Sequence, residues 1–120
     1  MEVVKKFWGE ERVIVNSPSY CTKELRLAAG FQSSLHRHAV KDEVFYCVSG
    51  NCELEVHGDE PPGQVSYFLS PGVWKRIPPG TWHRFKNPFG RDCVIVESSS
   101  THNDEDVERA EPSRRILEVN

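Results

Sequence analysis

The sequence lacks a long apolar run, a basic cluster and paired cysteines, and each absence excludes a class of protein. No stretch approaches the roughly 20 consecutive apolar residues that a membrane-spanning helix needs, and no apolar segment follows Met1 as in a secretory signal. The net charge is −3 and no basic patch stands out, which argues against a nucleic-acid partner. We therefore expect a cytoplasmic protein that binds neither membranes nor nucleic acid.

The cysteines are also scattered, with no C-x-x-C pair, so a zinc-finger site is not indicated. Cys47 and Cys52 flank a turn at Ser49-Gly50-Asn51, and a disulfide between them is conceivable. The alternative is that all four are small buried thiols in a reducing cytosol, and this is the state that we expect.

The stretch from Gly30 to Gly50 contains three side chains of the kinds that bind metals. His36 and His38 are two residues apart, so on a strand they face the same side, and Glu43 follows after a gap of four residues. The apolar run at 44–48 is rich in β-branched and aromatic residues and predicts a strand. We expect a hairpin with the two imidazoles on one strand and the carboxylate on the other.

A second stretch, from Gly72 to Asn87, supplies a fourth ligand. Its Pro78-Pro79-Gly80 segment forces a turn, and His83 opens the next apolar strand. Imidazole and carboxylate groups together suit one divalent transition metal such as Zn, Fe, Ni, Mn or Co. The alternative is ordinary surface or cross-strand histidines, but three of the five histidines fall at these positions. The sequence therefore predicts a metal site made by four residues: His36, His38, Glu43 and His83.

Most of the remaining chain has the pattern of short strands joined by turns. Strands are expected at 12–15, 20–29, 52–56, 65–69 and 93–97, without an internal repeat, a linker or a domain boundary. This pattern predicts one all-β domain over residues 1–120, with a core at about 11–98 and a closing tail at 99–120. In the tail, Asn103 precedes acidic residues as at a helix N-terminus, so a short helical turn is expected there.

The two ligand stretches resemble the two motifs of the cupin superfamily. The first motif is Gly, five residues, His-x-His, four residues, Glu, six residues and Gly; the second is Gly, five residues, Pro-x-Gly, two residues, His, three residues and Asn. Both are matched without a gap, by Gly30, His36, His38, Glu43 and Gly50 and by Gly72, Pro78, Gly80, His83 and Asn87. The resemblance implies the cupin double-stranded β-helix, a small jelly-roll-like barrel with one metal inside.

The chain is similar, nearly end to end, to the C-terminal cupin domain of type II mannose-6-phosphate isomerases. The shared segments are Trp8-Gly9, Lys23-x-Leu25-x-Leu27, Ser34-Leu35-His36-x-His38, Ile77-Pro78-x-Gly80-x-x-His83-Arg84 and Asp104-Glu105-Asp106-Val107-x-Arg109. The chain departs from that family in having His36 in place of the common Gln, Lys41 in place of the usual Arg, and no nucleotidyltransferase domain. The resemblance implies an aldose–ketose isomerase whose small-molecule substrate is a sugar or a sugar phosphate.

Such an isomerase moves a proton between C1 and C2 of the sugar while charge develops on two oxygens. A metal with four protein ligands keeps two octahedral positions open for a chelating substrate. Lys23, Glu24 and Lys86 are the candidates for the general base. Lys23 lies on the apolar face of its strand, from which it either extends to a barrel end or reaches into the pocket. Arg84 and Arg109 are expected to bind a substrate phosphate, because a guanidinium group donates two hydrogen bonds to it.

Two other functions use the same ligand set. One is a cupin dioxygenase with Fe(II), which oxygen consumption would identify, and the other is a non-enzymatic sugar- or metal-binding module, which would bind without turnover.

The N-terminal segment around Phe7 and Trp8 is expected to mediate assembly. This aromatic pair could cover a barrel mouth or enter a neighbouring subunit. Because the resemblance implies that cupin barrels of this size pair, a homodimer through this segment is expected.

Overall fold

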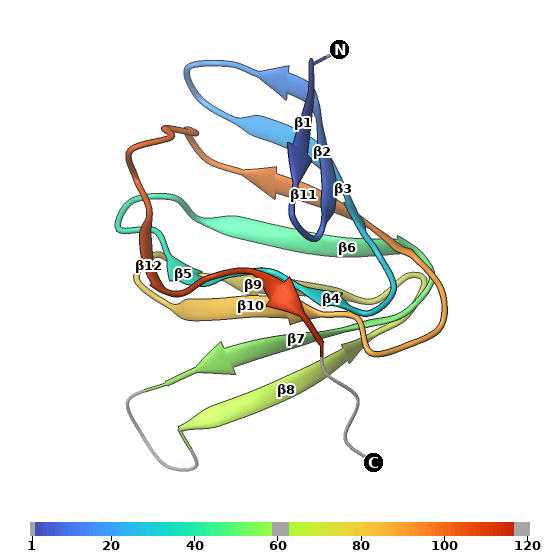
Figure 1. Cartoon of the computed structure of the whole chain (residues 1–120). Helices are drawn as coiled ribbons and strands as arrows, with labels where there is room; N and C mark the ends of the chain where they lie inside the picture. The colour runs from blue at the N-terminus through green and yellow to red at the C-terminus, as the bar shows by residue number, and fades with distance from the viewer. Residues whose placement is uncertain (1, 59–62, 117–120) are drawn as a thin grey trace.

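The computed structural model describes residues 2–58 and 63–116, which form two antiparallel β-sheets (Figure 1). The first sheet has six strands in the spatial order β1 (Glu2–Lys6), β2 (Gly9–Asn16), β3 (Cys21–Leu27), β11 (Cys93–Ser99), β6 (Glu43–Ser49) and β9 (Trp74–Ile77). The second has the order β12 (Glu108–Glu111), β5 (Leu35–Arg37), β10 (Trp82–Lys86), β4 (Phe31–Gln32) and β13 (Arg114–Arg115), and β7 (Cys52–His57) pairs with both β10 and β8 (Gln64–Leu69). The all-β prediction is confirmed.

The core lies between the two sheets, because strands of both sheets alternate buried and accessible residues. Every second residue of β3 and of β11 faces inward, and Phe45, Leu54 and Phe85 pack against these rows from other strands. Burying each such large apolar side chain contributes about 1.5–3 kcal/mol. The same alternation turns two charged residues inward, Lys23 and Glu97, which are paired opposite each other across β3 and β11.

The hairpin expected between the histidine strand and the run at 44–48 is wrong. β5 pairs with β10 and β12, whereas β6 pairs with β11 and β9, so the two segments belong to different sheets. Between His38 and Glu43 the chain crosses from one sheet to the other. The period of two fixes which side of a strand a residue faces, but it does not fix the partner strand. As a result, two imidazoles of one sheet face a carboxylate of the other across the interior.

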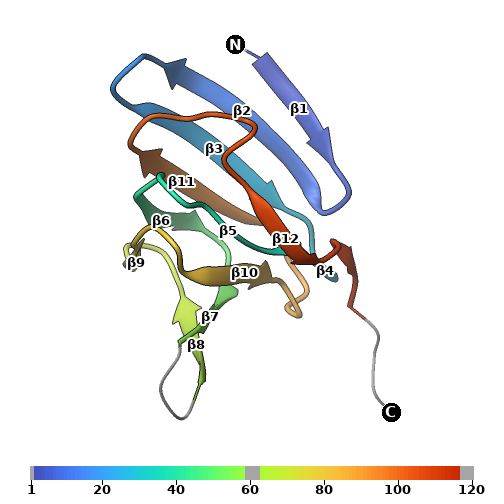
Figure 2. The same ribbon diagram turned by 90° about the vertical axis from the view of Figure 1, so that its left-hand side faces the viewer.

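The helical turn expected near the C-terminus is a single hydrogen-bonded turn. The N–H of Asp106 donates to the carbonyl of Asn103 (2.9 Å), and the N–H of Glu105 donates to Oδ1 of Asn103 (2.9 Å). None of residues 2–58 and 63–116 is helical, and the described chain has no helix long and apolar enough to cross a membrane. The turn goes no further because the next residues pair as β12 with β5. Figure 2 shows β12 beside its partner strand β5.

The glycine that ends the first cupin-like motif has a steric reason to be there. Gly50 closes the turn between β6 and β7 with a φ of +72°, a region that side chains with a Cβ rarely adopt. A Cβ at this position would also collide with the backbone carbonyl of Asp92. This turn brings no disulfide with it, because Cys47 and Cys52, like Cys21 and Cys93, are free and buried.

Candidate metal centre

Three imidazoles converge in the interior between the sheets. His36 lies on β5 directly opposite His83 on β10, and His38 follows immediately after β5. Each offers a ring nitrogen, and these three nitrogens lie within 4.8 Å of one another. Glu43 is the first residue of β6 and approaches from the opposite sheet. Its Oε1 lies 3.3 Å from Nε2 of His38, and its Oε2 lies 3.2 Å from Nε2 of His83.

Each of the three imidazoles has its Nδ1 against a backbone carbonyl. The distances are 2.8 Å from His36 to Ser34, 2.6 Å from His38 to Asp106 and 2.8 Å from His83 to Thr81. A carbonyl oxygen only accepts, so each Nδ1 carries the hydrogen and each Nε2 keeps a lone pair. This is the arrangement of metal-binding histidines, whose second nitrogen is usually held by such a bond.

The buried acceptors in this cluster lack donors. Nε2 of His83 and Oε2 of Glu43 are 3.2 Å apart, yet neither has a hydrogen-bond partner among the described residues. Two acceptors that face each other in a protein interior repel, and a cation bound between them would satisfy both. The donor set of three imidazole nitrogens and a carboxylate therefore fits a divalent transition metal.

The charge states agree with this fit. Burial, with a smaller effect from the neighbouring His83, lowers the pKa of His36 to about 3, so its imidazole is neutral. Burial by itself raises the pKa of Glu43, but its polar neighbours, the Lys41 ammonium group among them, outweigh burial and hold that pKa well below its usual range. The neutral imidazole of His36 and the ionised carboxylate of Glu43 are the forms that coordinate metals.

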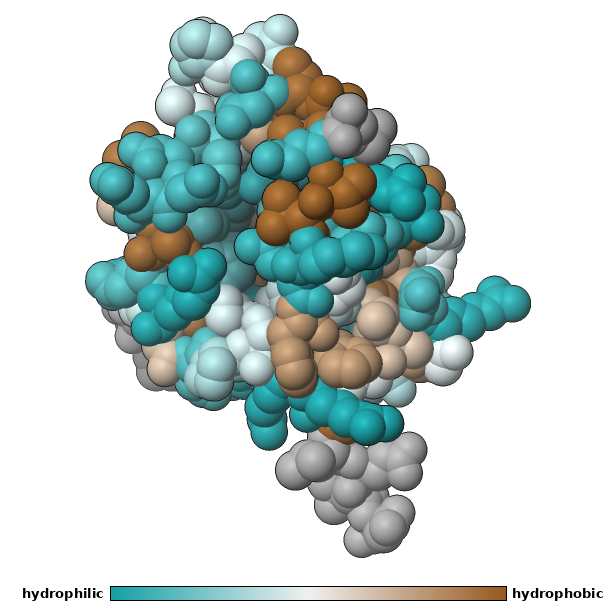
Figure 3. All heavy atoms as spheres, turned by 45° about the horizontal axis from the view of Figure 1, so that its top comes forward, coloured by the Kyte–Doolittle hydropathy of each residue, from teal (hydrophilic) through white to brown (hydrophobic). Residues whose placement is uncertain are grey.

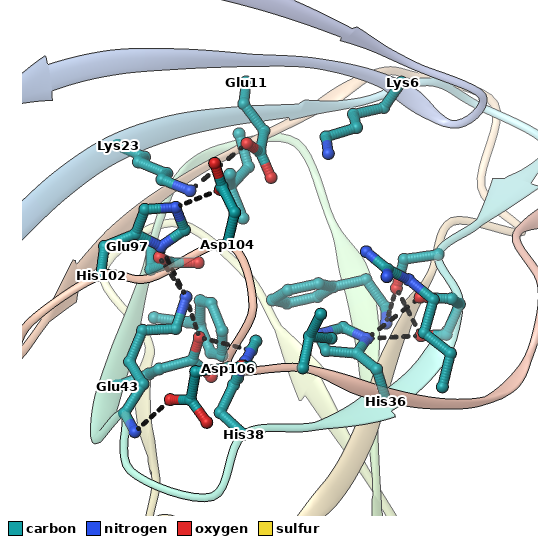
Figure 4. A pocket seen from close by; sticks show the side chains of 18 of the residues that line it. Lys6, Glu11, Lys23, His36, His38, Glu43, Glu97, His102, Asp104 and Asp106 are labelled. Carbon is teal, nitrogen blue, oxygen red and sulfur yellow. Dashed lines mark hydrogen bonds and ion pairs between the residues drawn. The ribbon is translucent and has the colours of Figure 1, made fainter.

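A second wall of the same cavity carries charged side chains (Figure 4). Nζ of Lys41 lies 3.3 Å from Oε1 of Glu43 and 3.6 Å from Oε2 of Glu97, so one ammonium group contacts both carboxylates. Nζ of Lys23 lies 3.4 Å from Oε2 of Glu11 on the neighbouring strand β2. Lys23, Lys41 and Glu97 are all buried although they border the cavity.

Glu97 differs from the other carboxylates of this wall. Burial, followed by the negative charge of Glu43, raises its pKa, although Lys41 and Lys23 act in the opposite direction. Its Oε2 accepts no hydrogen bond from any residue that the structure describes. A carboxylate that borders a cavity, has a raised pKa and has an oxygen without a hydrogen-bond donor has the properties of a general base.

The cavity between these walls has a volume of about 160 Å³. A buried water needs about 10–15 Å³ on this measure, so the space accepts on the order of ten non-hydrogen atoms, the size of a monosaccharide. Figure 3 shows a hollow on this face of the molecule with mainly hydrophilic residues around it. Two cations at the rim, Lys6 on β1 and Arg109 on β12, form no ion pair with a described residue.

The structure brings some of the predicted site residues to this cavity and leaves others outside it. The four metal ligands and two further candidates are close to it: Lys23 and Arg109 are both among its lining residues. Glu24 faces the opposite side of β3, where it accepts a hydrogen bond from Arg26 (2.9 Å). The even positions of β10 turn away from the interior in the same manner, since the inward positions are those of His83 and Phe85.

Arg84 and Lys86, which occupy these outward positions, bind Glu55 on β7 instead. Nε of Arg84 lies 2.8 Å from Oε2 of Glu55, and Nζ of Lys86 lies 2.8 Å from Oε1. Arg84 also reaches Glu111 of β12, with Nη1 and Oε1 3.1 Å apart. Neither cation lines the cavity, so the structure does not place them where a substrate in it would bind.

Three cavity residues were not singled out from the sequence as functional: Glu97, Lys41 and Asp106. A signal for Glu97 existed, because it continues the inward row of Cys93 and Ile95 at a spacing of two. Lys41 stood out only as a departure from a family pattern. Asp106 gave no local signal, because its partners are residues 39–41.

The family model of the cupin domain matches residues 23–99, so the chain belongs to the cupin family. The solved structure of KdgF from Halomonas sp. has the same fold, with a TM-score of 0.74 at 20% identity over 88% of this chain and 90% of that one. The cupin double-stranded β-helix predicted from the two motifs is therefore confirmed.

Two curated relatives have names that refer to sugar isomerisation. The chain is 33% identical to the D-lyxose/D-mannose isomerase of Thermosediminibacter oceani over 78% of its length, and it covers 62% of that protein. It is 34% identical to the D-lyxose ketol-isomerase of Cohnella laeviribosi over 76% of its length, and it covers 61% of that protein. The chain thus spans less than two thirds of either relative.

Proposed function

We propose that this protein is a metal-dependent aldose–ketose isomerase that acts on a monosaccharide. The observation that carries the proposal is the pairing of two walls in one cavity. Three Nε2 lone pairs and an ionised carboxylate lie on one wall, and a buried carboxylate, Glu97, whose Oε2 accepts no hydrogen bond from a described residue, lies on the other. The names of both curated relatives support a sugar as the substrate.

His36, His38, His83 and Glu43 would hold the metal. When bound, it would act as a Lewis acid that polarises the sugar's carbonyl and the neighbouring hydroxyl. A metal held by these four residues would accept a substrate that chelates through adjacent oxygens. The metal could be Zn, Fe, Mn, Ni or Co, since this donor set suits each of them.

Glu97 would move the proton between the two carbons. In the aldose-to-ketose direction it takes the proton from C2 and returns it to C1, while a proton passes from the C2 oxygen to the C1 oxygen. Lys41 remains protonated: burial lowers its pKa, but Glu97 and Glu43 outweigh that effect and raise it. It thus holds the base beside the ligand Glu43. Lys23, paired with Glu11, is placed to donate a hydrogen bond to a sugar oxygen.

Two cations at the rim of the cavity suit a phosphorylated sugar. Arg109 and Lys6 border the cavity without a carboxylate partner among the described residues, so a phosphate on the far end of the sugar would find two cations there. Both free and phosphorylated sugars are therefore proposed as substrates.

The strands that flank the family match belong to the same two sheets. β1 and β2 extend the sheet of β3, and β12 and β13 pair with β5 and β4. We propose on this ground that residues 1–120 form one cupin domain closed by the tail that begins at 99, of which residues 1, 59–62 and 117–120 lie outside the described residues.

The test is a substrate panel on protein of known metal content. The purified chain is stripped, reloaded separately with Mn²⁺, Co²⁺, Fe²⁺, Zn²⁺ or Ni²⁺, and assayed with D-lyxose, D-mannose and mannose 6-phosphate for the corresponding ketose. Conversion of at least one of these sugars that disappears on metal removal is expected. If every sugar is left unchanged while the Fe²⁺ form consumes oxygen with another substrate, the dioxygenase alternative replaces this proposal. Binding of a sugar without turnover would instead favour the binding-module alternative.

A further inference from the structure

Residues 100–113, which we name the closing strap, border the cavity and include β12. They contribute Asp106, Arg109 and several other residues to its lining. The strap is fastened to the second sheet by β12 and by an ion pair between Arg37 and Glu108 (2.9 Å). It is also fastened at a third place, beside the metal ligands. There Ser100 exchanges two hydrogen bonds with Asp42 (3.0 Å each) and His102 lies 3.5 Å from Nζ of Lys41, but the largest set of contacts comes from Asp106.

The carboxylate of Asp106 binds three successive backbone N–H groups. Oδ1 accepts from Ala39 (2.8 Å), Oδ2 accepts from Lys41 (3.0 Å), and both accept from Val40 (3.3 Å each). Successive N–H groups that converge in this way form a nest for an anion. These three residues lie in the segment that crosses between the sheets, with the ligand His38 at one end and the ligand Glu43 just beyond the other.

The backbone of Asp106 holds one of the ligands directly. Its carbonyl accepts the Nδ1–H of His38 at 2.6 Å. His36 and His83 differ in this respect, because each takes its carbonyl from a residue two positions away on its own segment. The partner of His38 lies 68 residues further along the chain. The orientation of His38 therefore depends on a distant segment, whereas that of the other two imidazoles is set locally.

We propose that Asp106 is the positioning residue of the metal centre and that docking of the closing strap is coupled to metal binding. Its carboxylate fixes the crossing segment and thereby keeps its carbonyl against His38, which orients the ring and leaves Nε2 free for the metal. Since such coupling is reciprocal, a bound metal also stabilises the docked strap. The inference rests on the metal site of the proposed function, and its test separates the two.

The affinity for Co²⁺ is measured by its visible absorption in the wild type and in three variants of the full chain. Asp106→Ala removes all the carboxylate bonds, and we expect a 10- to 100-fold weaker affinity, as for other residues that support metal ligands. Asp106→Asn keeps one acceptor oxygen and should fall between the two, which also guards against a variant that fails to fold. Glu105→Gln removes the neighbouring exposed carboxylate, whose side chain makes no described bond, and should leave the affinity unchanged.

A readout without metal tests the positioning itself. Nitrogen-15 spectra of the imidazoles in the metal-free protein should show His38 as the Nδ1–H tautomer in the wild type and as a mixture in Asp106→Ala. The signals of His36 and His83 should not change. If wild type binds Co²⁺ and the Ala variant binds it equally well with an unchanged His38 signal, the coupling is refuted and the metal centre stands. If the wild-type protein binds no Co²⁺, both the metal centre and the coupling to the closing strap are refuted.

Discussion

Glu97→Gln separates catalysis from stability, because the two should change in opposite directions. The substitution keeps the size of the side chain and removes only its ability to ionise. As the proposed base, Glu97 should contribute a factor of roughly 10²–10⁴ to the rate, which corresponds to about 2.7–5.4 kcal/mol at about 1.36 kcal/mol per factor of ten. The loss should appear in kcat, because the four residues that hold the substrate-binding metal are unchanged.

The same residue should weaken folding at neutral pH. The pKa of Glu97 is raised above its ordinary value of 4.5, chiefly by burial and then by Glu43. A carboxyl with a raised folded-state pKa favours folding below its unfolded pKa, and that contribution is lost as the pH rises through the folded value. The attractions of Lys41 and Lys23 are already included in this net direction. Glu97→Gln should therefore unfold at a higher urea concentration than wild type at pH 8, and the difference should shrink towards pH 4.5.

Two assays check these expectations. Initial rates on the metal-loaded enzyme from pH 5 to 9 should show an acid limb in wild type that reflects Glu97, with kcat strongly reduced in the variant. Urea unfolding of the metal-free proteins gives the stability difference. Glu24→Gln is the matched control, since Glu24 lies on the outer side of β3 beside Arg26. Full kcat in Glu97→Gln, or a lower stability at pH 8, would refute the role assigned to Glu97.

Three further predictions concern the metal, the rim and assembly. His83→Ala should lose most of its bound metal in elemental analysis. His57→Ala, which removes one of the partners of Glu55 outside the cavity, should keep its metal, and full occupancy in His83→Ala would contradict the ligand set. Arg109→Ala should raise KM for a phosphorylated sugar by roughly tenfold or more, as expected for charge-assisted hydrogen bonds of about 1.5–3 kcal/mol, and leave KM for the free sugar unchanged; an equal effect on both would argue against a phosphate subsite. Trp8 is buried and lines the cavity, so the predicted dimer contact falls to Phe7, which is 65% exposed. Phe7→Glu should convert the dimer to a monomer in light scattering, and a wild-type monomer at micromolar concentration would contradict the dimer itself.

The alternation of apolar residues was enough to place the long strands but not their partners. The runs at 52–56, 65–69 and 93–97 are strands in the structure with small changes at their ends. β12 has the sequence Glu-Arg-Ala-Glu and is exposed, so no burial pattern marks it, and only its pairing with β5 makes it a strand. The same limit explains the hairpin error, since the partner of β5 is chosen by contacts far away in the sequence.

The candidate site divides in a similar way. The metal ligands follow from motif spacing, and the inward side of β3 is enough to bring Lys23 to the cavity. Arg84 and Lys86 follow the ligand His83 by one and three residues, so the alternation of β10 turns them to its other side. That parity could have been applied to the sequence. The role of Asp106 could not, because it depends on a contact between segments that are more than sixty residues apart.

The four buried cysteines allow the opening of the barrel to be measured by thiol modification. All four thiols are fully buried, burial raises the pKa of Cys21, and burial together with Cys93 raises the pKa of Cys47 to about 12. Alkylating reagents attack the thiolate, so a native chain should resist them even at alkaline pH. Modification would then proceed only through molecules that have unfolded. The rate at which a thiol reagent is consumed therefore measures how often the barrel opens, without a dye or a mutation, and a ligand that tightens the barrel should slow it.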